Sequence, residues 1–185
     1  MIRFLYLFFL STLILTNNIN AKENIMILKL KDGDVKIEMF EDVAPNHVKR
    51  ITELANSGKY DNVVFHRVIE GFMAQTGDVQ FGNSSSKDFD LSKAGIGGSN
   101  LPDLKEEFNN IPHERGTVSM ARSSDPNSAN SQFFICFENA SYLDRQYTVF
   151  GRVIEGMEFV DKIKKGDGQS GSVTNPDKII SFKSQ

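Results

Sequence analysis

Two runs of mainly apolar residues mark the start of ordered structure in this chain. Ile25 to Leu30 is followed by Lys31-Asp32-Gly33-Asp34 and then by Val35 to Phe40, in which apolar and charged residues alternate at period two. Such alternation is typical of a strand with one buried and one solvated face. The Asp-Gly pair between the runs favours a tight turn. The pattern therefore predicts a β-hairpin at the start of the fold.

Two segments have helical periodicity instead. In the first, apolar residues recur every three or four positions: Ala44, Val48, Ile51, Leu54 and Ala55. Pro45 suits the first turn of this helix and Gly58 its end. A second helix is predicted from about Met157 to Lys165, with Gly166 after it.

The remaining apolar runs are short and separated by loops rich in glycine, serine and asparagine. Strands are predicted at Val63–Val68, Thr117–Met120, Ser131–Phe137, Tyr147–Val153 and, to close the fold, Ile179–Phe182. Many short strands with only two helices indicate a mainly β fold, a closed antiparallel barrel with the helices outside or capping its ends. No internal repeat or second domain is evident.

Residues 1–21 have the pattern of a secretory signal. Met1-Ile2-Arg3 gives a positive start, Phe4 to Leu15 is almost wholly apolar, and a polar stretch then ends at the small residue Ala21. Twelve residues are short against the roughly 20 that span a bilayer, so cleavage is favoured over an uncleaved anchor. We therefore expect a signal peptide at 1–21, a single domain at 22–185, and a periplasmic location without membrane attachment after cleavage.

Charge and cysteine content narrow the function. Without Arg3 the chain keeps 20 basic and 24 acidic residues, so no basic footprint for nucleic acid is expected. Cys136 is the only cysteine, which excludes an intramolecular disulfide. It stands in an apolar run that reads as a buried strand, where thiols are usually inert.

Several common catalytic motifs are absent. His47, His66 and His113 are far apart and have no ligand at metal-binding spacing, so no metal site is predicted. There is no G-x-S-x-G elbow of a serine hydrolase. The glycines of Gly95–Gly98 lack the strand-to-helix context of a phosphate loop.

One segment, residues 65–78, departs from ordinary strand and loop patterns. Within Val63–Val68, alternation places Arg67 on the same face as Phe65, and a charged group among apolar neighbours normally needs a partner. Gln75 could be that partner, beside an apolar wall of Phe72 and Met73. An arginine that extends its head to solvent from a strand end explains the pattern equally well.

The same segment reads F-H-R-x-I-x-x-F-M-x-Q-x-G-D from Phe65 to Asp78, and this run resembles the signature of the cyclophilin family. Further matches follow in the family's order: Gly116–Ala121, Ser131–Ile135, Leu143-Asp144 and Val149–Val153. The resemblance covers essentially the whole chain after residue 21. It implies an eight-stranded antiparallel barrel capped by two helices, and peptidyl-prolyl cis-trans isomerase activity.

The resemblance also implies roles for individual residues. Arg67 is similar to the family's catalytic arginine, and Gln75 to the residue that orients it. The implied pocket for the substrate proline ring is lined by Phe72, Met73, Phe134 and Leu143. The implied groove for the residues before proline is formed by Gln132 and the backbone of Ala121 and Arg122.

Tyr147 stands at the pocket edge, where the family often has a histidine. Three features depart from common family patterns. The stretch Arg122–Asn130 is one residue longer than in common eukaryotic members and resembles the bacterial pattern, and Thr76 stands where glycine is common. Tyr142 occupies the position of a tryptophan that contacts cyclosporin in many eukaryotic members. We therefore expect weak cyclosporin binding but intact catalysis.

An arginine beside an apolar pocket suits this reaction. An X–Pro bond resists rotation because the nitrogen lone pair is delocalised into the carbonyl, and twisting localises that pair on nitrogen. A guanidinium can then donate a hydrogen bond that the planar bond barely accepts. This chemistry needs no metal or cofactor, and its expected partners are proline-containing peptides and unfolded proteins, bound by a monomer.

Two other functions remain open from the sequence. The chain could be a proline-motif binding module or chaperone without significant turnover. A weaker alternative is a β-barrel that carries a small apolar ligand, which a filled interior would exclude.

Overall fold

The computed structural model describes residues 24–185, and the predicted signal at 1–21 lies outside the described residues. The strands are β1 (Ile25–Leu30), β2 (Gly33–Met39), β3 (Arg67–Ile69), β4 (Met73–Thr76), β5 (Thr117–Met120), β6 (Phe133–Cys136), β7 (Val149–Glu155) and β8 (Ser181–Ser184). The helices are α1 (Pro45–Asn56), α2 (Met157–Val160) and a 3₁₀ turn at Ser141–Leu143.

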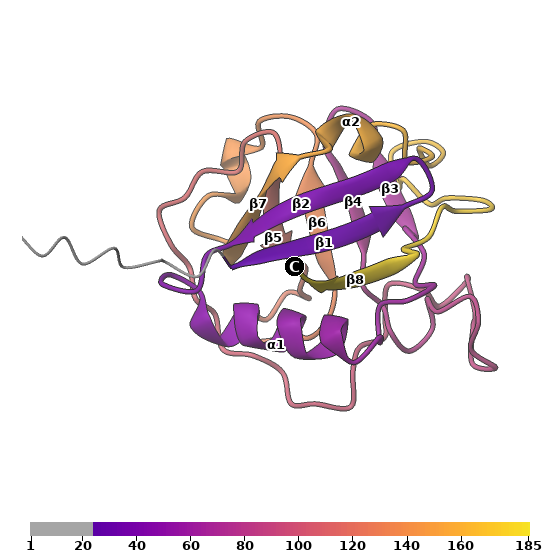
Figure 1. Ribbon diagram of the computed structural model, residues 1–185, viewed down its shortest axis with the longest axis horizontal. Coiled ribbons are helices and arrows are strands. Elements are labelled where there is room, and N and C mark those ends of the chain that lie inside the picture. The colour runs from indigo at the N-terminus through magenta and orange to yellow at the C-terminus, as the bar shows by residue number, and fades with distance from the viewer. Residues whose placement is uncertain (1–23) are drawn as a thin grey trace, which may run out of the picture.

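Eight antiparallel strands form one strongly curled sheet in the order β3-β4-β6-β5-β7-β2-β1-β8. Figure 1 shows α1 and α2 on opposite sides of this sheet. Helix α1 packs against β8 and β7, and α2 against β2. The predicted mainly β fold with eight antiparallel strands and two helices is therefore confirmed.

The predicted closure of the barrel is wrong, because the edge strands β3 and β8 do not pair with each other. The segments that precede β3 and β8 are joined only by isolated backbone hydrogen bonds and bridges. The Phe65 N–H donates to the Asp177 carbonyl at 2.8 Å, and the Ile179 N–H to that of Val63 at 2.9 Å. Strand β3 begins at Arg67, after the residues that make these two hydrogen bonds. Pro176 has no N–H with which to continue a ladder of hydrogen bonds between the two edges. The sheet is thus a curled half-barrel.

The first hairpin forms in the predicted place, but its turn differs from the expected one. Leu30 pairs with Gly33, so the two loop residues are Lys31 and Asp32 rather than the Asp-Gly pair. Gly33 is required for a different reason. A β-carbon there would lie 2.4 Å from the ring of Phe159, which covers the turn from α2.

The concave side of the sheet is filled with large side chains. Phe133 lies at the centre, with its ring centroid 5.6 Å from Tyr60, 5.8 Å from Phe182 and 6.1 Å from Phe150. All four residues are fully buried. These rings occupy the place where a carrier of small apolar molecules would need space for its ligand.

The two helices fit their predictions unequally. Helix α1 begins at Pro45 and ends at Asn56, as its pattern predicts. Helix α2 ends at Val160 and not near Lys165. After Val160 the chain makes a turn in which the Ile163 N–H donates to the Val160 carbonyl, three residues back. Ile163 is buried there. Across residues 24–185, no helix has the length and apolarity needed to cross a bilayer.

Candidate active site

Strands β4 and β6 are apolar on both faces, and this creates the site. Ala74 and Ile135 are paired across these strands and point into the main core. Their neighbours Met73, Phe134 and Cys136 point the other way, where they form a second, smaller apolar cluster. The site therefore lies on the outer face of the sheet, separate from the core that holds the fold together.

Arg67 belongs to this outer face, and the prediction that it shares a face with Phe65 is wrong. The residues before Arg67 form isolated bridges and no regular strand, so the alternation assumed for Val63–Val68 does not hold. Phe65 lies in the main core together with Val68. Arg67 is opposite Gln75 in the β3–β4 pair.

A small cavity of about 140 Å³ opens at the outer cluster. Nine of the predicted residues line it: Arg67, Phe72, Met73, Gln75, Ala121, Arg122, Phe134, Leu143 and Tyr147. Pockets for drug-sized ligands are larger, about 300–1,000 Å³. The cavity is therefore of a size for one side chain.

The Arg67 guanidinium is held at the edge of this cavity from two sides. Its Nη1 donates to Gln75 Oε1 at 3.4 Å, and its Nε donates to the carbonyl of Ser170 at 3.1 Å. Within residues 24–185, no hydrogen bond engages Nη2. One arm of the guanidinium is thus left to donate to a bound molecule.

Ser170 is a contact that sequence reasoning missed. It lies in the glycine-rich segment 166–171, 103 residues from Arg67. The segment is pinned against β3, since the Val68 N–H donates to the Gly171 carbonyl at 2.8 Å. A β-carbon on Gly171 would lie 2.4 Å from Ile69. Close approach of this backbone to β3 therefore needs glycine at 171.

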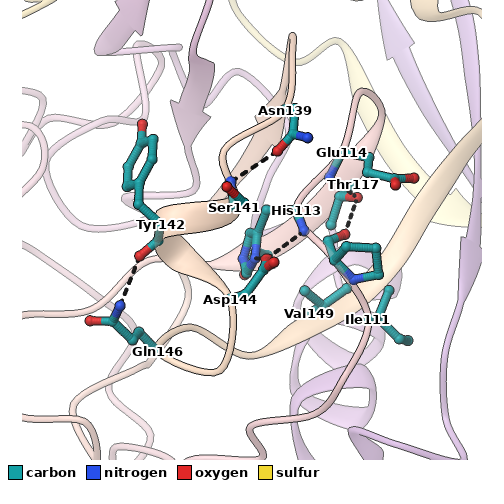
Figure 2. A network of polar contacts seen from close by, with 12 residues as sticks. Ile111, His113, Glu114, Thr117, Asn139, Ser141, Tyr142, Asp144, Gln146 and Val149 are labelled. Atoms are coloured by element: carbon teal, nitrogen blue, oxygen red, sulfur yellow. Dashed lines mark hydrogen bonds and ion pairs between the residues drawn. The ribbon is translucent and has the colours of Figure 1, made fainter.

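The remaining predicted residues lie beside the cavity. Gln132 lines an adjoining groove of about 540 Å³, which shares Gln75, Ala121 and Arg122 with the cavity. Tyr142 lines neither space. It is 62% exposed, and its ring packs against Phe72 with a centroid distance of 5.7 Å. Figure 2 shows its side chain pointing away from the neighbouring polar network.

That network supports the floor of the cavity and was also missed from sequence. Asp144 Oδ1 accepts from the backbone N–H of His113 at 2.8 Å and contacts its Nδ1 at 2.9 Å (Figure 2). His113 Nε2 lies 3.0 Å from Ser119 Oγ, and the ring stacks on Phe134 at 6.1 Å. Burial lowers the pKa of His113, opposed by its hydrogen bond to Asp144. A neutral, fixed imidazole thus backs Phe134.

Cys136 and Thr76 are packed into the sheet. Cys136 is fully buried, as predicted, and burial raises its pKa to about 12, so the thiol is inert. The Thr76 hydroxyl donates to the Val64 carbonyl at 2.9 Å, which ties β4 to the segment before β3. Among residues 24–185, no three His, Cys, Asp or Glu side chains gather in a way that could hold a metal ion.

Comparison with known proteins connects this geometry to a family. The family model described as "Cyclophilin type peptidyl-prolyl cis-trans isomerase/CLD" matches residues 25–184. A "Probable peptidyl-prolyl cis-trans isomerase" of Brucella suis is 60% identical over 159 residues, 85% of this chain and 81% of that protein. "Peptidyl-prolyl cis-trans isomerase A" of Dickeya dadantii is 39% identical over 145 residues, 76% of this chain and 70% of that protein.

Solved structures show the same fold. A cyclophilin from Hirschia baltica superposes with a TM-score of 0.71 at 27% identity, covering 86% of this chain and 73% of that one. A cyclophilin-type isomerase from Cryptosporidium parvum, crystallised in the presence of the dipeptide Ala-Pro, gives 0.73 at 27% identity, covering 87% and 98%. With a family match across the described strands, and an arginine beside a small cavity that has apolar walls on one side, the chain belongs to the cyclophilin-type peptidyl-prolyl cis-trans isomerases.

Proposed function

We propose that this chain accelerates the cis–trans interconversion of X–Pro bonds in exported and unfolded proteins, with Arg67 as the catalytic residue. The proline ring enters the cavity floored by Phe134 and walled by Phe72 and Met73. Residues before the proline lie in the groove beside Gln132. No metal or cofactor takes part in this scheme, because rotation about the bond breaks no covalent bond.

The observation that carries this proposal is the position of the Arg67 guanidinium. Gln75 and Ser170 hold it at the edge of a cavity of about 140 Å³, whose walls include Phe72, Met73 and Phe134. A proline ring in that cavity places its nitrogen near the guanidinium. As the bond twists and the lone pair localises, the nitrogen becomes a better hydrogen-bond acceptor. Arg67 therefore binds the transition state more tightly than the planar substrate.

The magnitudes fit this assignment. Uncatalysed exchange takes tens to hundreds of seconds, so a millisecond reaction needs an acceleration of about 10⁴-fold, or roughly 5–6 kcal/mol. One preorganised donor aimed at developing charge contributes about 2.7–4 kcal/mol. The rest is assigned to the grip on the ring by the apolar walls and to partial exclusion of water.

The direct test is an exchange assay on a short X–Pro peptide. We expect added protein to broaden or average the cis and trans resonances of the peptide in exchange NMR, because the exchange becomes faster than the uncatalysed rate. The measurement needs no protease and also reports binding. Peptide binding without faster exchange would contradict the proposal and favour a proline-motif binding module or chaperone.

We further propose that the chain is exported to the periplasm through residues 1–21. The support is the positive start, the apolar run and the small residue Ala21 in the sequence. Expression of the full chain in a Gram-negative host should yield a periplasmic protein whose N-terminal sequencing starts at Lys22. Recovery of uncleaved chain from the cytoplasm would contradict export.

A further inference from the structure

A buried carboxylate lies behind the groove without lining it. Asp78 has no exposed surface, and its two oxygens accept four backbone hydrogen bonds. Oδ1 accepts from the N–H groups of Gln80 and Phe81 in its own turn, at 3.0 and 2.9 Å. Oδ2 accepts from those of Gly95 and Gly97, at 2.7 and 2.9 Å. The carboxylate thereby fixes a loop 17–19 residues away in sequence.

The loop that Asp78 fixes determines which way Gln132 faces. The carbonyls of Gly95 and Gly97 both accept from Gln132 Nε2, at 3.0 and 2.7 Å. Carbonyl oxygens can only accept, so only the NH₂ end of the Gln132 amide satisfies this pair. The opposite end, Oε1, must then point toward Gln75, whose Nε2 donates to it at 3.0 Å.

The orientation of the Gln75 amide in turn determines which of its two ends faces Arg67. Since its NH₂ group is directed at Gln132, its Oε1 faces Arg67 Nη1 at 3.4 Å. If either amide turned over, two donors or two acceptors would face each other along this series of hydrogen bonds, and both would be left unpaired. Each bond therefore depends on the one before it.

We infer that Asp78 is a positioning residue, which sets the orientation of the Arg67 guanidinium through the 95–97 backbone, Gln132 and Gln75. This inference rests on the proposed function, since it names what holds the catalytic arm in place. It goes beyond the contact between Arg67 and Gln75, because the Asp78 carboxylate makes no hydrogen bond to either residue in the described part of the chain. The 3.4 Å bond from Arg67 to Gln75 is at the long end of hydrogen-bond distances, so a small turn of the Gln75 amide is enough to break it.

The first test replaces Asp78 with asparagine in the protein purified from expression of the full chain. The new NH₂ group has to face one of the two pairs of backbone donors, Gln80 and Phe81 or Gly95 and Gly97. The link between the turn and the loop is therefore broken on one side, and the two amides lose their fixed direction. We expect kcat/KM for X–Pro exchange to fall about tenfold, mainly through kcat, with the circular dichroism spectrum retained. The NMR signal of the Arg67 Nε–H group should shift as well.

Asp90→Asn is the matched control. Asp90 accepts from Ser92 at the start of the same loop region and pairs with Lys93 at 3.1 Å, but it is half-exposed, and its side chain makes no bond to Gly95 or Gly97. This variant should keep wild-type exchange and an unshifted Arg67 signal. Equal effects of Asp78→Asn and Asp90→Asn would overturn the inference.

A second variant, Gln132→Glu, tests the direction of the chain even if Asp78→Asn fails to fold. An ionised carboxylate still accepts from Gln75 but faces two carbonyls without a proton to donate. Once protonated, it can donate to one of them. Activity relative to wild type should therefore be low at pH 7.5 and rise toward pH 5, whereas a pH-independent ratio would refute the proposed polarity.

Failure of the proposed function is distinguishable from failure of this inference. If the wild-type protein does not accelerate exchange, the proposed function falls. The shift of the Arg67 Nε–H signal in Asp78→Asn, compared with Asp90→Asn, then decides the positioning role by itself.

Discussion

Replacing Arg67 with alanine is expected to lower kcat/KM for X–Pro exchange by about 10²–10³-fold, the usual effect of removing one preorganised donor. Arg67 lies on the outer face of the sheet, away from the main core, so the fold should survive. The cavity keeps its apolar walls, so binding of an X–Pro peptide should change less than turnover. Exchange NMR gives the rate, and a titration of the same peptide gives the binding.

Two comparisons make this result specific. Arg115→Ala removes an exposed arginine paired with Asp161 at 2.7 Å, and should leave exchange unchanged. Arg67→Lys keeps the charge but cannot donate from Nε to Ser170 and from Nη1 to Gln75 at once, so it should also lose most activity. Exchange within about twofold of wild type in Arg67→Ala would contradict the catalytic role.

Local patterns in the sequence predicted the parts of the fold that depend on neighbouring residues. The hairpin of β1 and β2 and the helix α1 appear where alternation and helical spacing place them. Closure of the barrel could not be predicted in this way. It depends on whether two edges far apart in sequence pair, and here the short β3 and the proline at 176 prevent a ladder.

The site, too, was predictable where it depends on local motifs and not where it depends on contacts between distant segments. Its residues were identified by the dense run from Phe65 to Asp78 and the later matches, and the structure gathers nine of them around one cavity. The face occupied by Arg67 was predicted wrongly, since the strand starts at Arg67 itself. Ser170 gave no signal, because a backbone carbonyl can come from any residue type.

The location of the cavity has a physical consequence for stability. Met73 of β4 and Phe134 of β6 bury apolar surface in the outer cluster, while Ala74 and Ile135 on the same two strands belong to the main core. Changes to the outer cluster therefore act first on substrate binding. Changes to buried residues outside that cluster act on the fold, and His66, a buried titratable residue directly before Arg67, is one of them.

His66 is held neutral by its surroundings. Its side chain belongs to four consecutive buried residues, Val63 to His66, and is only 7% exposed. Neither ring nitrogen finds a hydrogen-bond partner in the described part of the chain. Burial lowers its pKa to about 4, which the negative charge of Asp78 opposes and the positive charge of Arg67 reinforces.

We therefore expect the protein to lose stability on mild acidification. The unfolded chain protonates this histidine near pH 6.5, whereas the folded protein resists protonation until about pH 4. Its contribution is complete above pH 6.5 and falls as the pH drops toward 4, by about 3 kcal/mol in total. Burial also lowers the pKa of His47 and His113, which adds to the loss in the same direction.

Urea unfolding of wild type and His66→Gln at pH 7.5 and pH 5 measures this contribution. Roughly two thirds of the His66 share, about 2 kcal/mol, should be lost by pH 5 in wild type and be absent from the variant. The difference between the two pH values is the relevant quantity, since glutamine also changes packing beside Gly95. His113→Gln is the matched control: its ring has partners at both nitrogens, so the substitution should remove a smaller part of the pH dependence. An unchanged pH dependence in His66→Gln would show that the folded protein accommodates the imidazolium, and that acid sensitivity arises elsewhere.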